Sequence, residues 1–322
     1  MATAEQLKAL IKSHFEADQE RFTTLAMQVA AHEARQGHDS LARDIRSLVD
    51  RAGTPSPKII PFRRDLDDLI LASDPQGHLS DLIVVEEARR RVERVLREYR
   101  QQEKLHKHGL RHRRKLLLTG PPGTGKTLTA SLLAAELHLP LYTVLMDKLV
   151  TKFMGETSAK LRQVFDAIKE HQGVYLFDEF DAIGAERGLD NDVGEIRRVL
   201  NAFLQFIERD ESDSLIVAAT NNVKLLDQAL FRRFDDVLRY ALPTEGEIRR
   251  LIANHVGGAI GNRPAVSRLV KAAAGLSHAE IAQACDDAVK EAILADQPAV
   301  TPPLLLAMLD QRRAAYETRG GG

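Results

Sequence analysis

The chain contains the octapeptide Gly120-Pro121-Pro122-Gly123-Thr124-Gly125-Lys126-Thr127. An apolar run, 115–119, precedes it, and a segment of helical character, 128–135, follows it. In the order strand, glycine loop, helix, the pattern Gly-x-x-x-x-Gly-Lys-Thr predicts a phosphate-binding loop. Glycine lets backbone N–H groups approach phosphate oxygens at a helix N-terminus. A chance match in a glycine-rich turn is the alternative, but the flanking segments favour a nucleotide site.

The two residues that end this loop have predicted roles of their own. Lys126 is expected to reach the β- and γ-phosphates, and Thr127 is expected to place its hydroxyl on Mg²⁺. The other predicted contacts to the nucleotide come from Gly120, Pro121, Pro122, Gly123, Thr124, Gly125 and Leu128. The sequence therefore predicts a site for ATP, or a close relative, together with Mg²⁺.

Composition limits the class of protein. The 322 residues suffice for two or three domains with proper cores. A formal net charge of −1 argues against nucleic acid or an anionic membrane as the partner. The single cysteine, Cys285, excludes an intramolecular disulfide and is expected to be a buried helical residue. Because neither a signal peptide nor an apolar run of about 18 residues is apparent, we expect a cytoplasmic protein without membrane contact.

Strand and helix patterns alternate in the middle of the chain. Strands are predicted at 115–119, 141–145, 174–177, 215–219 and 237–241, with helical patterns between them. This alternation predicts an α/β fold, a parallel sheet with helices on both faces as in P-loop NTPases. From Pro243 onward only helical patterns occur, and Thr244 with Glu247 and Ser277 with Glu280 each fit a capping box. We therefore expect a large α/β domain at 65–242, a small helical lid domain at 243–316 and a tail at 317–322.

The N-terminal residues 1–52 have the pattern of a helical hairpin. Apolar positions repeat with helical spacing over 5–35, Gly37 interrupts them, and a shorter helix is expected over 41–49. The proline-containing segment 53–64 is predicted to be a linker. Since such a hairpin cannot bury its apolar face alone, it must dock on something. The sequence leaves open whether it recruits a partner or substrate, or packs as a structural arm.

Lys104–Arg114 is a basic segment that contains His106, His108 and His112. The spacings of these histidines fit no standard metal motif. We predict a solvated charged face here in preference to a nucleic-acid patch.

Polar residues follow two of the predicted strands. Asp178 and Glu179 come directly after 174–177, and the carboxyl ends of strands are where ligands bind in such sheets. Asp178 is predicted to hold Mg²⁺, and Glu179 to orient and deprotonate the attacking water. Asn221 follows the strand at 215–219 and is placed to contact the γ-phosphate and that water; ordinary turn chemistry is the alternative.

Four segments together resemble the AAA branch of the AAA+ ATPases, in the family's order and spacing. They are the glycine loop and the segments 178–182, 218–221 and 226–235. The resemblance covers about residues 65 to 315 and is to bacterial single-ring proteins with an ATPase core of the katanin, spastin and FtsH type. It implies a homo-hexameric ring with ATP held between adjacent subunits.

The resemblance also implies roles for individual residues. Arg232 and Arg233 match the arginines that reach into the neighbouring subunit's site. The segment lacks the Pro-Gly that separates two such arginines in a longer form, so which of them is the arginine finger stays open. His255 is expected near the ribose or base, and Ala279 near the adenine. His278 stands where the family has a glycine, which brings a close backbone approach to the nucleotide into question.

Residues 148–156 resemble the loop that projects into the central pore of these rings. Lys152, Phe153 and Met154 are expected to grip a translocating polypeptide through non-specific apolar contact. A core position for Phe153 at a helix end is the alternative. The chain has neither the His-Glu-x-x-His nor the Gly-x-Ser-x-Gly motif of a protease, so degradation would need a separately encoded protease.

The resemblance thus implies an ATP-driven unfoldase that acts on protein substrates. Two alternatives stay open: a nucleic-acid-acting AAA+ motor, and a scaffold that binds ATP but turns it over slowly.

Overall fold

The computed structural model describes residues 8, 13, 19–35, 66, 68–149, 154–181, 192–222, 231–257 and 263–317. The chain divides into two compact units, Met1–Lys58 and Ile59–Gly322. In the first unit, helix α2 (Gln19–Arg35) buries Ala26, Val29 and Ala30. The expected second helix at 41–49 and the linker at 53–64 lie outside the described residues, so the hairpin stays a prediction.

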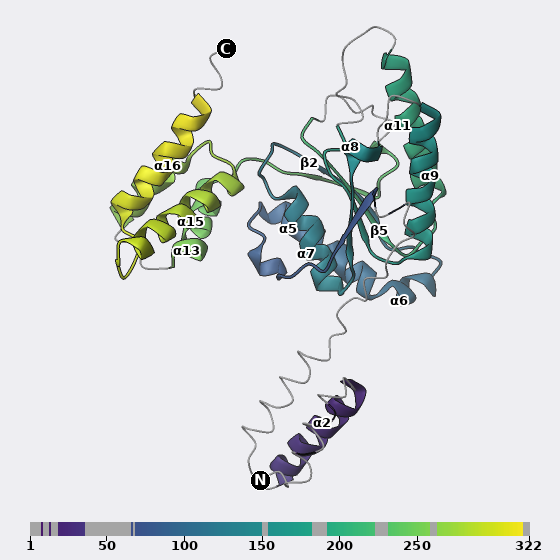
Figure 1. Cartoon of the computed structure of the whole chain (residues 1–322), viewed down its shortest axis with the longest axis horizontal. Helices are drawn as coiled ribbons and strands as arrows, with labels where there is room; N and C mark the ends of the chain where they lie inside the picture. Colours follow the sequence, from purple (N-terminus) through teal and green to yellow (C-terminus); the bar gives the residue numbers. More distant parts are fainter. Residues whose placement is uncertain are drawn as a thin grey trace. The chain divides into compact units, whose positions relative to one another are not determined.

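The second unit contains a six-stranded sheet of order β1-β3-β4-β5-β2-β6 (Figure 1). The pairs β3–β4, β4–β5, β5–β2 and β2–β6 are parallel, as the sequence predicts. The edge strand β1 was not predicted; it pairs antiparallel with β3, and of its four residues Ile70 is buried whereas Leu71 is exposed. The strands are β1 (Ile70–Ser73), β2 (Lys115–Thr119), β3 (Leu141–Val144), β4 (Val174–Phe177), β5 (Leu215–Thr220) and β6 (Asp236–Arg239).

Helices cover both faces of this sheet, which confirms the predicted architecture (Figure 1). Leu117 points to the face that carries α9 and α11, whereas Leu116 and Leu118 point to the face that carries α5 and α7. Because β2 is buried on both faces, its sequence is a continuous apolar run without alternation. The helices of this layer are α5 (Glu86–Arg100), α6 (Gln102–His106), α7 (Lys126–Leu137), α8 (Met146–Leu149), α9 (Met154–Glu170) and α11 (Asp192–Arg209), with a short 3₁₀ helix at Leu79–Asp81.

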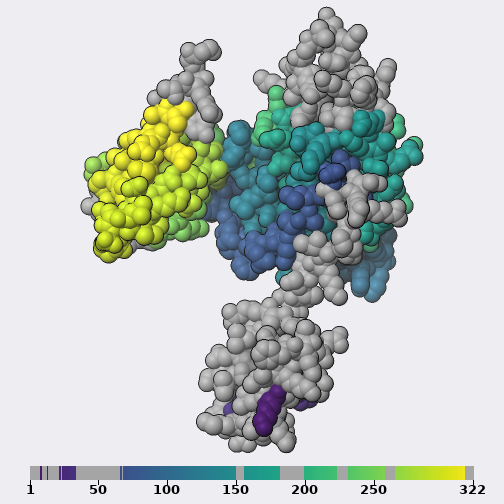
Figure 2. Space-filling model, viewed as in Figure 1, coloured from purple at the N-terminus to yellow at the C-terminus, as the bar shows by residue number. Residues whose placement is uncertain are grey.

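Four helices follow the sheet and share a core of their own: α13 (Glu245–Val256), α14 (Arg263–Ala273), α15 (His278–Leu294) and α16 (Pro302–Glu317). Both predicted capping boxes are present, at Thr244 and at Ser277. Cys285 is fully buried in this core, as expected, and burial raises the pKa of its thiol to about 12. Figure 2 shows α16 in yellow on the surface of this helical part. No helix in the described ranges, α16 included, is both long and apolar enough to cross a membrane.

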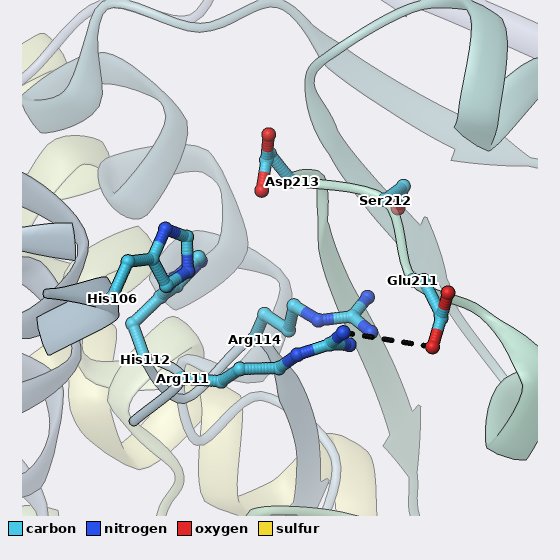
Figure 3. A pocket seen from close by; sticks show the side chains of 7 residues that line it. All are labelled: His106, Arg111, His112, Arg114, Glu211, Ser212 and Asp213. Atoms are coloured by element: carbon cyan, nitrogen blue, oxygen red, sulfur yellow. Dashed lines mark ion pairs between the residues drawn. The ribbon is translucent and has the colours of Figure 1, made fainter. Parts of the chain in front are cut away.

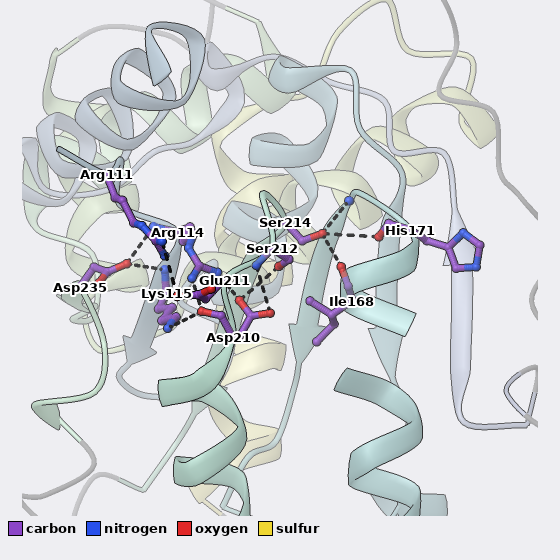
Figure 4. Close-up of polar contacts among 11 residues, drawn as sticks. Arg111, Arg114, Lys115, Ile168, His171, Asp210, Glu211, Ser212, Ser214 and Asp235 are labelled. Atoms are coloured by element: carbon purple, nitrogen blue, oxygen red, sulfur yellow. Dashed lines mark hydrogen bonds and ion pairs between the residues drawn. The ribbon is translucent and has the colours of Figure 1, made fainter. Parts of the chain in front are cut away.

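The prediction of a solvated face at Lys104–Arg114 is wrong for its last residues. Arg114 is only 5% exposed, and its guanidinium donates to the carboxylate and the backbone carbonyl of Asp210 (Figure 4). Lys115 Nζ also donates to the Asp210 carbonyl, at 3.2 Å. Charge patterning along the segment could not reveal this burial, because Asp210 lies 96 residues further along the chain.

His112 is the second buried residue of this segment. Its ring lies edge-on against Tyr99, with the centroids 5.1 Å apart, and burial lowers the pKa of the imidazole. With Arg111, Glu211 and Asp213 it lines a cavity of about 100 Å³ at the amino ends of β2 and β5 (Figure 3). The segment is therefore part of the base of the α/β layer, and only some of its charges are solvated.

Arg114→Met should destabilise the protein strongly, because it leaves the buried Asp210 carboxylate without its ionic partner. Breaking a buried pair on one side costs about 3–5 kcal/mol. The matched control is Arg111→Met, because Arg111 forms an exposed ion pair with Glu211 at 3.5 Å. Exposed ion pairs contribute about 0–1 kcal/mol to the free energy of unfolding. Thermal unfolding followed by circular dichroism would measure both variants. Equal stability losses would contradict the structural role given to Arg114.

Candidate active site

The glycine loop joins β2 to α7. Two of its glycines stand at positions where a side chain would have no room. Gly120 has φ +150° and Gly123 has φ +71°. A Cβ on Gly120 would lie 2.4 Å from the carbonyl oxygen of Tyr240, and one on Gly123 would lie 2.5 Å from Ser277 Oγ. The loop therefore lies in close contact with Tyr240, which follows β6, on one side and with Ser277, the N-cap of α15, on the other.

Internal hydrogen bonds hold the loop open as a cradle. Thr124 Oγ1 donates to the Pro121 carbonyl at 2.7 Å, and Lys126 Nζ donates to the carbonyls of Gly120 and Pro121, each at 2.8 Å. Helix α7 begins at Lys126, so the backbone N–H groups of its first turn have no acceptor within the helix. These donors and the positive end of the helix dipole favour an anion here. Burial lowers the pKa of Lys126, and the carboxylates of Asp178 and Asp181 act in the opposite direction.

The end of β4 meets this cradle. Thr127 Oγ1 donates to Asp178 Oδ2 at 2.6 Å, although the two residues are 51 positions apart. Asp178 Oδ1 accepts from the backbone N–H of Glu179 at 2.9 Å. Glu179 itself is exposed and has φ +50°, which is uncommon for a residue other than glycine. A hydroxyl and a carboxylate in contact supply the hard oxygen ligands that Mg²⁺ prefers.

The end of β5 lies beside the end of β4. The Phe180 N–H donates to the Ala219 carbonyl at 2.8 Å. Asp181 Oδ1 accepts from Thr220 Oγ1 at 3.1 Å and from the Asn221 N–H at 3.2 Å. Asn221 was predicted from its place after a strand, whereas no role was predicted for Asp181. The sequence signal for Asp181 was its position three residues after Asp178.

A cavity of about 430 Å³ extends from the glycine loop to α13 and α15, a size suited to a small molecule. The Ala279 N–H donates to the Gly123 carbonyl at 2.9 Å, and His278 lines the cavity, so the effect of His278 on the backbone approach to the nucleotide stays a prediction. Sequence reasoning missed the wall formed by the residues between the 3₁₀ helix and α5. The lining residues are Asp81, Leu82, Ile83, Gly123, Thr124, Gly125, Lys126, Thr127, Leu128, Leu251, His255, His278, Ala279 and Ala282.

Other predicted site residues lie elsewhere. Arg232 and Arg233 are exposed and do not line this cavity, and Arg233 forms an ion pair with Glu208 at 3.1 Å. Lys152 and Phe153 lie outside the described residues, and Met154 is the first residue of α9. The pore loop therefore stays a prediction.

Comparison with known proteins decides the family. Residues 116–242 match the ATPase family associated with various cellular activities (AAA). An uncharacterized AAA family ATPase of Sinorhizobium fredii, y4kL, is 33% identical over 302 residues, which cover 91% of this chain and 90% of that protein. The chain belongs to the AAA family of ATPases. ATP binding and ATP hydrolysis follow from that membership, and the recognition made from the sequence is confirmed.

Two further relatives are longer than this AAA chain. The ATP-dependent zinc metalloprotease FtsH 2 of Sphaerobacter thermophilus is 30% identical over 273 residues, 83% of this chain and 42% of that protein. The proteasome-activating nucleotidase of Methanopyrus kandleri is 31% identical over 276 residues, 82% of this chain and 63% of that protein. The AAA chain thus spans less than two thirds of either protein.

Gly123→Ala should weaken ATP binding by about tenfold or more, because the new Cβ meets Ser277 Oγ and the left-handed backbone becomes strained, at about 1–3 kcal/mol. Gly246→Ala is the matched control, since a Cβ there meets nothing within 4 Å and Gly246 has no positive φ. Titration with a fluorescent ATP analogue would give both dissociation constants. Unchanged affinity in Gly123→Ala would contradict the tight contact between the loop and α15.

Proposed function

We propose that this AAA ATPase is a cytoplasmic protein unfoldase, a homo-hexameric ring that uses ATP hydrolysis to thread polypeptides through its centre. One observation carries the enzymatic part of the proposal: the 2.6 Å hydrogen bond that brings Thr127 and Asp178 together, with Glu179 next in the chain. The relatives named above support the rest, because one is named as an ATP-dependent protease and the other as an activator of the proteasome.

In this proposal the chain's own groups bind and orient ATP. The N–H groups of the first turn of α7 and the Lys126 ammonium bind the phosphates. Thr127 and Asp178 hold Mg²⁺, which when bound offsets phosphate charge. The Glu179 carboxylate takes a proton from the attacking water, and Asn221 contacts the γ-phosphate. The adenine and ribose occupy the cavity between the glycine loop and α13 and α15, beside His255 and Ala279.

The two arginines are not equivalent in this structure. Arg233 is held by Glu208 of its own chain, whereas among the described residues Arg232 has no partner and is exposed. We therefore assign Arg232 as the residue that reaches the neighbouring subunit's site and neutralises transition-state charge there. Arg233 then orients the backbone next to Arg232 through its ion pair with Glu208.

Substrate contact is assigned to Lys152, Phe153 and Met154 at the central pore. An aromatic and a thioether side chain grip a polypeptide without requiring a particular sequence. The N-terminal helices would recruit the substrate or its adaptor. Because the chain carries neither protease motif, degradation would depend on a separately encoded protease as partner.

The test is a capture experiment with Glu179→Gln, which should bind ATP, hydrolyse it slowly and hold its substrate. The variant is purified from its host with ATP, and both bound protein and bound nucleic acid are quantified. The matched control carries Phe153→Ala in addition. We expect retained protein that is lost with Phe153→Ala at unchanged ATP binding. Nucleic acid retained regardless of Phe153 would overturn the unfoldase and favour a nucleic-acid motor.

A further inference from the structure

We propose that Asp181 is a positioning residue for ATP hydrolysis, which ties the carboxyl end of β4 to that of β5. By doing so it fixes Glu179 relative to Asn221. The inference rests on the roles proposed above for Glu179 and Asn221. It assigns to the third acidic residue after β4 a task that neither Mg²⁺ binding nor water activation requires of it.

Three hydrogen bonds form what we call the β4–β5 clasp. The Phe180 N–H donates to the Ala219 carbonyl at 2.8 Å, and Thr220 Oγ1 and the Asn221 N–H donate to the same carboxylate oxygen, Asp181 Oδ1. The first bond joins backbones and would survive most substitutions. The other two converge on one atom, so a single side chain controls the position of Asn221.

The clasp matters for Glu179 because the Glu179 side chain depends on its backbone for its direction. Among the described residues no hydrogen bond or ion pair holds the Glu179 carboxylate, which is exposed. Its direction is therefore set by its backbone, which has the unusual φ of +50°. Such a conformation costs about 1–3 kcal/mol and persists only when its surroundings impose it.

Both neighbours of Glu179 are anchored. On one side, Asp178 accepts from Thr127 Oγ1 at 2.6 Å and from the Glu179 N–H at 2.9 Å. On the other, Phe180 is fully buried, with its ring 4.6 Å from that of Phe203, and Asp181 is held by β5. Loss of the Asp181 bonds would free Asp181 and the start of the Asn221 turn together.

Thr220 gives a second way to examine the same contact. Its side chain is fully buried, and its hydroxyl donates to Asp181 while accepting from the Asn222 N–H at 3.1 Å. Thr220→Val removes that donor at nearly constant volume, whereas Thr220→Ser keeps it. A pure charge effect of Asp181 on Lys126 would be insensitive to this pair of variants.

The experiment compares Asp181→Ala with Asp181→Asn in the full-length protein, measuring kcat, the Kd of a fluorescent ATP analogue and the unfolding midpoint. Asparagine keeps Oδ1 as an acceptor, so it should stay within about threefold of the wild-type kcat. Asp181→Ala should lower kcat by about 10–100-fold, since misplacement of about 1 Å can cost about 10²-fold. In both variants Kd should stay within about threefold of wild type.

Each outcome decides the matter. A wild-type kcat in Asp181→Ala, or a loss in Asp181→Asn as large as in Asp181→Ala, would overturn the clasp; so would Kd and the unfolding midpoint worsening in step with kcat. Thr220→Val should follow Asp181→Ala, and Thr220→Ser should not. Glu179→Gln is assayed in parallel: if it retains activity, the proposed role of Glu179 fails, which is distinct from failure of the clasp alone.

Discussion

Parallel pairing of β4, β5 and β2 is the constraint on which the site depends. Phe177 is level with Ala218, and Thr119 is level with Thr220. Since the strands run in the same direction, the residues that follow them emerge at one edge of the sheet. The glycine loop, Asp178 with Glu179, and Asn221 are therefore neighbours although the chain separates them by about 40 to 100 residues.

The same edge is closed from outside by the C-terminal helices. The glycine loop approaches α15 so closely that Gly123 has no room for a side chain, and the Ala279 N–H completes the contact. Ile83, which precedes α5, packs into the core of those helices. Nucleotide bound in the cavity would thus touch both the glycine loop and the C-terminal helices. Nucleotide binding and the placement of these helices against the loop are therefore energetically linked.

Much of this could be predicted from the sequence, because the informative patterns were local. The run at 115–119 and the octapeptide after it specify strand, loop and helix within about 20 residues, and the capping boxes that begin at Thr244 and Ser277 each span four residues. What could not be predicted depends on partners far along the chain. Burial of Arg114 required Asp210, and the role of Asp181 required Thr220 on another strand. The edge strand β1 escaped notice because a strand of four residues is too short to show a periodicity.

A mixing experiment tests most directly the central claim, that hydrolysis needs Glu179 from one copy and Arg232 from the next. Glu179→Gln and Arg232→Ala are purified separately, each checked for ATP binding, and their ATPase rates are measured alone and after mixing. Each variant alone should be inactive, and the mixture should recover activity, because roughly a quarter of randomly formed interfaces combine an intact Glu179 with an intact arginine. Wild-type hydrolysis by Arg232→Ala alone, or no recovery on mixing while both variants bind ATP, would contradict it.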